Sequence, residues 1–244
     1  MVHGAFCGGW VFDAFRTRFE AAGHRVAAPD LPGHAPGADA AGLSMRDYAD
    51  AVVRHCQAFE TAPVLIGHSL GGLACQLAAP RARPAGLILL APSAPWGVHG
   101  STMEEGASAI GLYALGPFWL QAVAPDYRLA RTYSLDRLDR AARDATFARM
   151  VPESGRALWE TLNWWLDPFM TTQVAAAPGL PVLAVAGGRD LIHPPATVRQ
   201  TAERLGGKVE VLPEMSHWLP AEPGWEGVAD LCLAWMDRTL RAAA

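Results

Sequence analysis

The segment Gly67-His68-Ser69-Leu70-Gly71 follows the apolar residues 63–66 and precedes a run with helical spacing. Its glycines stand two positions before and two positions after the serine, an arrangement that lets a strand and a helix approach each other without a side-chain clash. A serine at the tip of so sharp a turn holds its hydroxyl clear of the sheet. We therefore predict that Ser69 lies on a strand–turn–helix and is a nucleophile.

Short apolar runs bounded by Gly, Pro or Asp alternate with longer runs of helical spacing along most of the chain. The predicted strands are residues 25–28, 63–66, 87–90, 181–186 and 208–212, and the predicted helices are residues 10–22, 44–59, 70–79, 194–205 and 225–240. Ser44 is a plausible N-cap of the second helix. This alternation predicts an α/β fold with a mainly parallel sheet flanked by helices.

The alternation breaks between residues 95 and 178, where helical patterns continue without a convincing strand. We interpret this stretch as a helical cap inserted after the fourth predicted strand, counting the strand end that leads into His3. The α/β core then comprises residues 1–94 and 179–244. Aromatic residues are frequent in the cap, so we expect an apolar pocket beneath it, with Trp96 in contact with substrate. Arginines in the cap interleave with aspartates, which favours a solvated helix face over a carboxylate-binding site.

Composition places the chain among globular domains and excludes several kinds of partner. Of its 244 residues 51% are hydrophobic and 18% are charged, and the formal net charge is −4 with a pI near 6.0. We expect no nucleic-acid partner, because there is no basic field, and no membrane partner, because no apolar run is long enough to span a bilayer. The first residues do not resemble a secretory signal, so we expect a cytoplasmic protein. Monomer and homodimer both stay open.

The cysteines and histidines are not spaced as metal ligands. Four scattered cysteines, without a Cys-x-x-Cys pair, predict reduced and mostly buried thiols, with no structural zinc. The four cysteines are Cys7, Cys56, Cys75 and Cys232. No metal or organic cofactor is expected.

A serine hydroxyl needs a base to take its proton and a third group to orient that base. His217 follows the predicted strand 208–212, and Asp190 follows the strand 181–186, so both belong at the carboxyl ends of strands where active-site loops of α/β folds collect. The chain order Ser69, Asp190, His217 is that of α/β hydrolases. Asp30 also ends a strand, but it precedes the serine and is the weaker candidate.

The N-terminal sequence His3-Gly4-Ala5-Phe6 predicts a loop that aims backbone N–H groups at a developing oxyanion. We expect the N–H groups of Ala5 and Leu70 to be the two donors, with Phe6 as second choice for the first of them. Phe6 is also expected to contact substrate. His3 is predicted to orient the loop rather than to carry a proton.

The other histidines are assigned less specific places. His68 should pack beside its strand, and His34 could line the site. Surface or internally satisfied positions are expected for the rest. These are His24, His55, His99 and His193.

Residues 2–10, which read Val-His-Gly-Ala-Phe-Cys-Gly-Gly-Trp, and residues 21–26 resemble the plant methyl esterase and hydroxynitrile lyase branch of the α/β-hydrolase superfamily. Residues 67–72 and the region 181–219 are similar to the superfamily's serine esterase type. The resemblance implies the α/β-hydrolase fold, Ser69, Asp190 and His217 as a catalytic triad, and Ala5 and Leu70 as oxyanion donors.

One position separates the chain from the lyases of that branch. Cyanohydrin-cleaving members carry a lysine directly after the catalytic histidine, whereas this chain has Trp218, which we expect to contact substrate instead. Dehalogenases and epoxide hydrolases need an aspartate nucleophile, and Ser69 excludes their chemistry.

We therefore predict a serine hydrolase that cleaves a small carboxylic ester with an apolar or aromatic moiety through an acyl-enzyme. The same residues could serve a lactonase, a thioesterase, a perhydrolase, an amidase or a C–C bond hydrolase, because substrate choice lies in the cap. A receptor that binds a ligand on this fold without turnover is a less favoured alternative.

Overall fold

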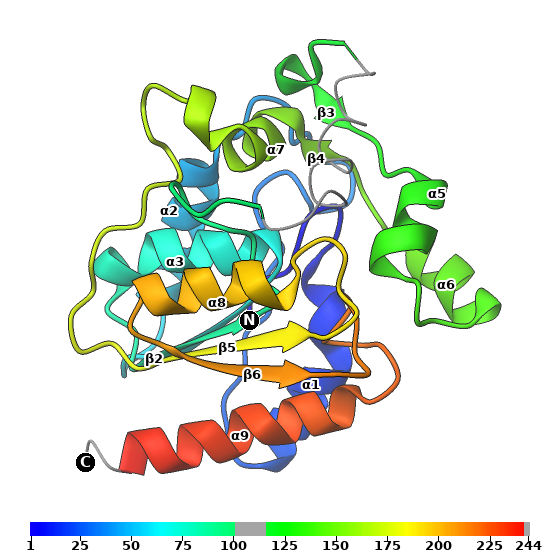
Figure 1. Ribbon diagram of the computed structural model, residues 1–244. Helices are drawn as coiled ribbons and strands as arrows, with labels where there is room; N and C mark the ends of the chain where they lie inside the picture. The colour runs from blue at the N-terminus through cyan, green and yellow to red at the C-terminus, as the bar shows by residue number, and fades with distance from the viewer. Residues whose placement is uncertain (101–115, 242–244) are drawn as a thin grey trace.

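A computed structural model describes residues 1–100 and 116–241 and contains a four-stranded parallel sheet (Figure 1). The strands are β1 (Val64–His68), β2 (Gly86–Leu90), β5 (Val182–Gly187) and β6 (Lys208–Leu212), adjacent in that order. Every pair is parallel, with Val64 opposite Gly86 and Leu183 opposite Lys208 at the registers that open two of the ladders. The predicted α/β architecture with a mainly parallel sheet is confirmed.

Helices cover both faces of this sheet (Figure 1). One face carries α2 (Met45–Cys56), α3 (Leu70–Ala82) and α8 (Pro195–Arg204), and the other carries α1 (Asp13–Ala21), which follows a 3-10 turn at Gly9–Phe12, and α9 (Trp225–Arg241). The predicted helices therefore exist. Ser44 caps α2 in a capping box, since its hydroxyl accepts the N–H of Asp47 and the Asp47 carboxylate accepts the N–H of Ser44.

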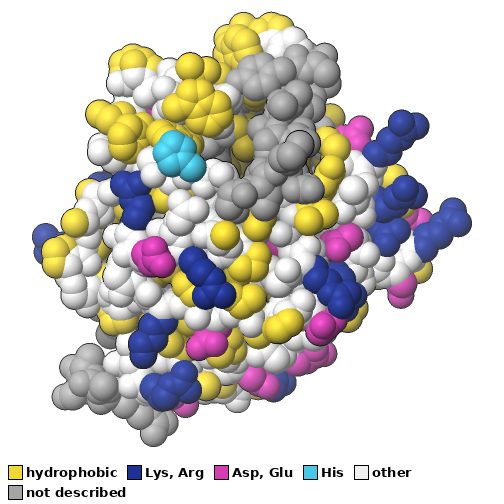
Figure 2. Space-filling model, viewed as in Figure 1, with side chains coloured by type: hydrophobic (Ala, Val, Ile, Leu, Met, Phe, Trp, Pro, Cys, Tyr) yellow, Lys and Arg dark blue, Asp and Glu magenta, His cyan; other side chains and the backbone are white. Residues whose placement is uncertain are grey.

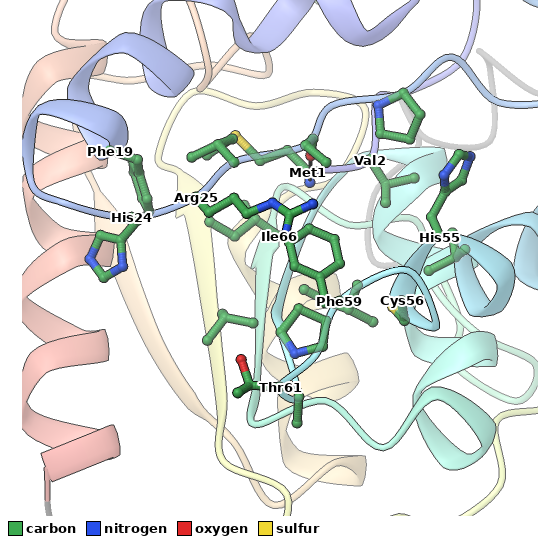
Figure 3. A pocket seen from close by; sticks show the side chains of 18 of the residues that line it. Met1, Val2, Phe19, His24, Arg25, His55, Cys56, Phe59, Thr61 and Ile66 are labelled. Atoms are coloured by element: carbon green, nitrogen blue, oxygen red, sulfur yellow. Dashed lines mark hydrogen bonds between the residues drawn. The ribbon is translucent and has the colours of Figure 1, made fainter.

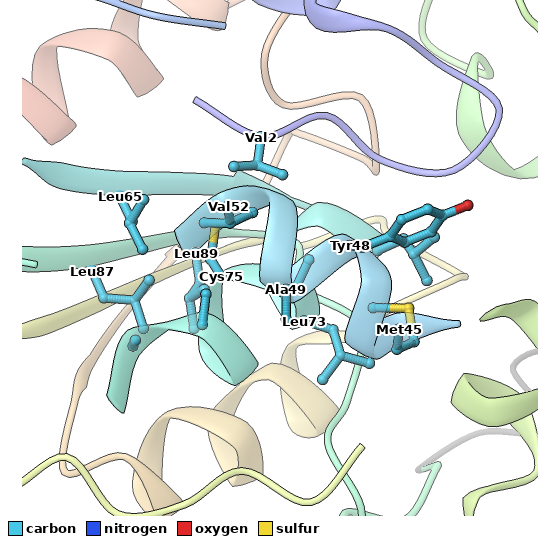
Figure 4. Packing of buried hydrophobic residues seen from close by; sticks show 14 of the residues in the cluster. Val2, Met45, Tyr48, Ala49, Val52, Leu65, Leu73, Cys75, Leu87 and Leu89 are labelled. Atoms are coloured by element: carbon cyan, nitrogen blue, oxygen red, sulfur yellow. The ribbon is translucent and has the colours of Figure 1, made fainter. Parts of the chain in front are cut away.

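Two hydrophobic cores lie between the sheet and its helical layers. In the first, Val52 of α2 and Leu73 of α3 pack with Leu87 and Leu89 of β2 (Figure 4). Tyr48 lies at the edge of this cluster, with its hydroxyl directed away from the apolar side chains (Figure 4). Burial of these side chains fixes the carboxyl ends of the strands relative to one another. The predicted site residues lie at these strand ends.

The prediction of a strand at residues 25–28 is wrong. Extended residues become a strand only when a neighbour supplies a ladder of hydrogen bonds. The structure gives this stretch a bond from the Met1 ammonium to the carbonyl oxygen of Ala27, at 2.6 Å. Val2 in turn forms an isolated parallel bridge with Gly67 of the β1 strand.

A cavity of about 360 Å³ lies beside this stretch. It is lined by Arg25, by its neighbours and by β1 residues such as Ile66 (Figure 3).

Residues 116–178, which lie between β2 and β5 and which we call the intervening segment, contain a series of short elements. Its elements, in chain order, are η2 (Phe118–Leu120), β3 (Ala122–Val123), α5 (Tyr127–Leu129), η3 (Ala130–Ser134), α6 (Arg140–Phe147), β4 (Glu153–Ser154), α7 (Gly155–Leu162) and η4 (Trp164–Leu166). The expectation of helical patterns without a strand needs a correction, because β3 and β4 pair antiparallel through two residues each. Residues 101–115 of the predicted cap lie outside the described residues.

Apolar side chains are exposed on the intervening segment (Figure 2). Phe169 is 76% exposed, and Leu120, Trp165 and Leu166 each exceed half exposure. The predicted solvated arginines lie on α6 and around it, where Arg140 pairs with Asp144 at 3.8 Å. Arg149 stacks over the Trp10 ring, 4.3 Å from its centroid.

Candidate active site

Ser69 occupies the sharp turn between β1 and α3 that the glycine spacing predicts. Its backbone is left-handed, with φ of 51° and ψ of −123°, a conformation that costs a non-glycine residue about 1–3 kcal/mol. A Cβ on Gly71 would lie 2.2 Å from the carbonyl oxygen of His3, and one on Gly67 would lie 2.6 Å from the carbonyl oxygen of Gly71. Glycine is therefore required on both sides of the serine, because backbone atoms fill the space of a side chain.

The structure brings Ser69, His217 and Asp190 into one hydrogen-bonded chain. His217 Nε2 lies 3.1 Å from Ser69 Oγ, and His217 Nδ1 lies 2.9 Å from Asp190 Oδ2. All three residues are less than 9% exposed. Asp190 is held by the loop after β5, where its second oxygen accepts the N–H groups of Ile192 and His193 at 2.8 and 2.9 Å. These contacts fix the orientation of the carboxylate.

The electrostatics of the group define the tautomer of His217. Burial by itself would raise the pKa of the Asp190 carboxyl. The nearby His217 and the hydrogen bonds that the carboxylate accepts outweigh burial, so this pKa is lowered. An ionised Asp190 accepts from Nδ1–H of His217. Nε2 is then left as the acceptor that faces the Ser69 hydroxyl.

The predicted oxyanion loop lies directly against the serine. A Cβ on Gly4 would be 3.0 Å from the Cβ of Ser69. Phe6 N–H donates to the carboxylate of Glu153 at 3.3 Å, which removes Phe6 as an alternative oxyanion donor. Ala5 N–H and the N–H of Leu70, at the first position of α3, stay available in the described part of the chain.

The predicted substrate contacts fall in different environments. Phe6 is half-buried and packs with Trp159 against an apolar cluster of the intervening segment. Trp96 is also half-buried, and its ring lies 5.4 Å from that of Trp164. Trp218 is only 3% exposed, and its ring packs against His68 in the second hydrophobic core, where a large side chain beside a buried loop contributes packing.

Sequence reasoning missed how closely His193 approaches His217. Its ring lies 5.3 Å from that of His217, and its Nε2 is 3.0 Å from the hydroxyl of Ser93. Burial and the neighbouring His217 lower the pKa of His193 to about 3, so it is neutral. The usable signal was its position three residues after Asp190, within the same loop.

Two further side chains hold the loop that carries His217. His68 donates from Nε2 to the His217 carbonyl oxygen at 2.8 Å, and burial lowers the pKa of this histidine to about 3. Glu222 accepts the N–H of Ser216 at 2.6 Å, and burial raises the pKa of its carboxyl to about 7. The backbone on both sides of the catalytic candidate is thus anchored.

Other sequence candidates lie elsewhere. Asp30 accepts the N–H of Gly9 at 2.8 Å, whereas Asp190 is the acid that the structure pairs with His217. His34 is buried against Glu153. The four cysteines are free and buried, as predicted.

Within residues 1–100 and 116–241, no cluster of three or more His, Cys, Asp or Glu side chains has the arrangement of a metal site. Over the same ranges, no helix combines the length and apolarity that a membrane span requires.

Comparison with known proteins places the chain in a family. The model of the alpha/beta hydrolase family matches residues 1–231, so the chain belongs to the alpha/beta hydrolase family. A pimeloyl-(acyl-carrier protein) methyl ester esterase of Neisseria meningitidis is 29% identical over 226 residues, which cover 89% of this chain and 70% of that protein. A pyrethroid hydrolase of Sphingobium wenxiniae is 44% identical over 75 residues, 30% of this chain and 26% of that relative's length.

Solved structures share the fold over nearly the whole chain. A pyrethroid hydrolase from Sphingobium faniae superposes with a TM-score of 0.69 at 25% identity, covering 97% of this chain and 95% of that one. A methylesterase from Arabidopsis has a TM-score of 0.71 at 18% identity, with 96% and 97% covered, a likeness that shows the fold alone. The relatives cleave esters or are hydrolases by name, which supports an esterase-type enzyme.

Proposed function

We propose that this protein is a serine esterase that cleaves a carboxylic ester with an apolar or aromatic moiety through an acyl-enzyme at Ser69. The observation that carries the proposal is the continuous chain from Asp190 through His217 to Ser69, with contacts of 2.9 and 3.1 Å. A serine hydroxyl beside a histidine whose Nε2 can accept its proton is what acyl transfer to a hydroxyl requires.

In this mechanism His217 Nε2 takes the proton of Ser69 as Oγ forms a bond to the ester carbonyl carbon. The N–H groups of Ala5 and Leu70 bind the oxyanion of the tetrahedral intermediate. His217 then gives the proton to the departing alcohol as the C–O bond breaks. Water, deprotonated by His217, attacks the acyl-enzyme and releases the acid and Ser69.

We further propose that residues 95–178 act as a cap that supplies the substrate pocket. The support is an apolar cluster of Phe118, Val123 and Leu158 that packs against Ala5 and Phe6, next to the proposed oxyanion donor. An apolar wall at that position favours apolar or aromatic groups over charged ones. We keep Phe6 and Trp96 as proposed substrate contacts, whereas Trp218 is proposed to act only through packing beneath the His217 loop.

The experiment is labelling with a fluorophosphonate probe, with the Ser69→Ala variant beside the wild type and adducts located by peptide mass spectrometry. We expect an adduct on Ser69 in the wild type, none in the variant, and turnover of aryl and methyl esters that the variant lacks. Folded wild type that neither forms the adduct nor turns over an ester panel would refute the proposal. Thermal stabilisation by esters without turnover would favour the receptor alternative.

A further inference from the structure

Glu153 of β4 is a buried carboxylate that joins the intervening segment to the oxyanion loop. Its side chain is fully buried. One oxygen accepts the Tyr48 hydroxyl at 2.5 Å and the N–H of Ser154 at 2.7 Å. The other accepts from His34 Nε2 at 3.0 Å and from Phe6 N–H at 3.3 Å. Four donors therefore converge on one side chain, and three of them, from Phe6, His34 and Tyr48, lie far from Glu153 in the sequence.

The partners of His34 indicate that this cluster contains an ion pair. Its Nδ1 lies 3.0 Å from the carbonyl oxygen of Pro32, while Nε2 faces Glu153, so both ring nitrogens face acceptors. Only the imidazolium donates from both. Burial opposes each charge, but the contact with the partner outweighs burial, which raises the pKa of His34 and lowers that of Glu153. The carboxylate is charged and its donors hold it in place.

The first peptide plane of the oxyanion loop is oriented by His3. His3 Nε2 accepts the N–H of Leu31 at 2.9 Å, which requires the proton to be on Nδ1, and Nδ1 donates to the Gly4 carbonyl oxygen at 2.9 Å. The carbonyl of Gly4 and the N–H of Ala5 belong to one planar unit and point in opposite directions. Holding the carbonyl therefore sets the direction of the Ala5 N–H.

The next two planes are held from the intervening segment. Phe6 has a φ of 63°, a left-handed conformation that is strained for a residue with a side chain. Its N–H donates to Glu153, and its carbonyl oxygen accepts the N–H of Val151 at 2.9 Å. The Ala5 carbonyl, in the same plane as the Phe6 N–H, accepts from the Cys7 thiol at 3.1 Å. Without Glu153 the strained Phe6 loses a charged acceptor, and the peptide plane that carries its N–H is held less firmly.

We propose that Glu153 is a positioning residue of the oxyanion hole: by clamping Phe6 N–H, it keeps the Ala5 N–H directed at the reacting carbonyl and couples the intervening segment to catalysis. This inference rests on the proposed esterase function. It predicts that loss of the clamp weakens binding of the transition state more than binding of the substrate.

A carboxylate that only ties the intervening segment to the core would behave differently, and the chain offers a matched control. Glu160 of α7 is 3% exposed and accepts the N–H of Met45 at 2.8 Å and Arg156 Nε at 2.9 Å. It ties the same segment to the core without touching the oxyanion loop. Replacing either glutamate by glutamine removes one buried charge and nearly preserves shape.

The experiment compares Glu153→Gln and Glu160→Gln with the wild type in three measurements. These are kcat and KM for an aryl ester, the inhibition constant of an aryl trifluoromethyl ketone, and the melting temperature. Addition of Ser69 Oγ to the ketone carbon moves the serine proton to His217 and forms an oxyanion that the hole must bind. We expect Glu153→Gln to lower kcat by about 10- to 100-fold, less than the loss of a whole donor, with KM within about threefold. Its affinity for the ketone should fall in parallel with kcat.

Glu160→Gln should keep kcat and ketone affinity within about threefold of the wild type, whatever its melting temperature. Equal kcat losses in both variants, or a Glu153→Gln enzyme with unchanged kcat and ketone affinity, would overturn the inference while leaving the esterase function intact. A wild type without turnover or ketone binding would instead refute the esterase function itself. If Glu153→Gln does not fold, Glu153→Asp keeps the negative charge but shortens the side chain, which draws the carboxylate back from the Phe6 N–H, its longest contact at 3.3 Å. The same selective loss is then expected, and its absence overturns the inference.

Discussion

Asp190→Asn is expected to lower kcat by about 10⁴-fold without unfolding the protein. The reasoning begins with the two backbone N–H groups of Ile192 and His193, which point at one oxygen of Asp190 from 2.8 and 2.9 Å. An asparagine keeps its carbonyl oxygen toward these donors, since the reverse orientation would face its NH₂ against them. The NH₂ group therefore faces His217 Nδ1, which must become an acceptor.

The consequence is a histidine with the wrong tautomer. With Nδ1 accepting, the proton lies on Nε2, which is 3.1 Å from Ser69 Oγ and can no longer take the serine proton. The same change of tautomer in a serine protease lowers kcat by about 10⁴-fold, which corresponds to about 5.4 kcal/mol of activation free energy.

The assay is steady-state hydrolysis of a chromogenic ester together with the rate of fluorophosphonate labelling, both of which should fall in parallel. A melting curve checks that the variant is folded. Asp30→Asn is the control, because that exposed carboxylate accepts the N–H of Gly9 and an amide oxygen can do the same. A loss of less than about tenfold in Asp190→Asn would show that Asp190 does not set the tautomer of His217.

Two further predictions concern stability. Gly71→Ala should lower the unfolding free energy by about 1–3 kcal/mol, because its Cβ would meet the His3 carbonyl oxygen. Gly227→Ala in α9, where open space surrounds the Cβ, should raise the unfolding free energy by about 0.5–1 kcal/mol. Urea unfolding of both variants measures the difference, and equal effects would contradict the packing argument. Burial raises the pKa of Glu222 to about 7, so its contribution of up to about 3 kcal/mol is full below the ordinary glutamate pKa and is lost as pH rises through about 7. Unfolding free energy should therefore fall less steeply in Glu222→Gln than in the wild type between about pH 5 and 7, and parallel slopes would show that this carboxyl does not titrate there.

Much of the fold could be predicted because its signals are local. Alternating apolar runs and helical spacing depend on neighbours a few residues apart, and they placed the strands of the parallel sheet and the principal helices. Residues 25–28 show the limit of such a pattern. Their composition suits a strand, but a ladder needs a partner strand, and in the described part of the chain the Met1 ammonium bonds to Ala27 without forming one. The two-residue pairing of β3 with β4 likewise carries no periodicity that a sequence could reveal.

The candidate site also has features that the sequence predicts and features that only the tertiary structure shows. Glycine spacing around Ser69, and the order of serine, acid and histidine along the chain, were readable because turn geometry and strand ends leave local marks. Only the tertiary structure joins Ser69 to His217 across 148 residues, brings His193 against the histidine, and sets Glu153 on Phe6 across 147 residues. Sequence alone therefore determined which residues have the chemistry for acyl transfer, whereas the packing of distant segments decided which are held within hydrogen-bond reach, because hydrogen bonds act over about 3 Å and chain order does not specify such distances.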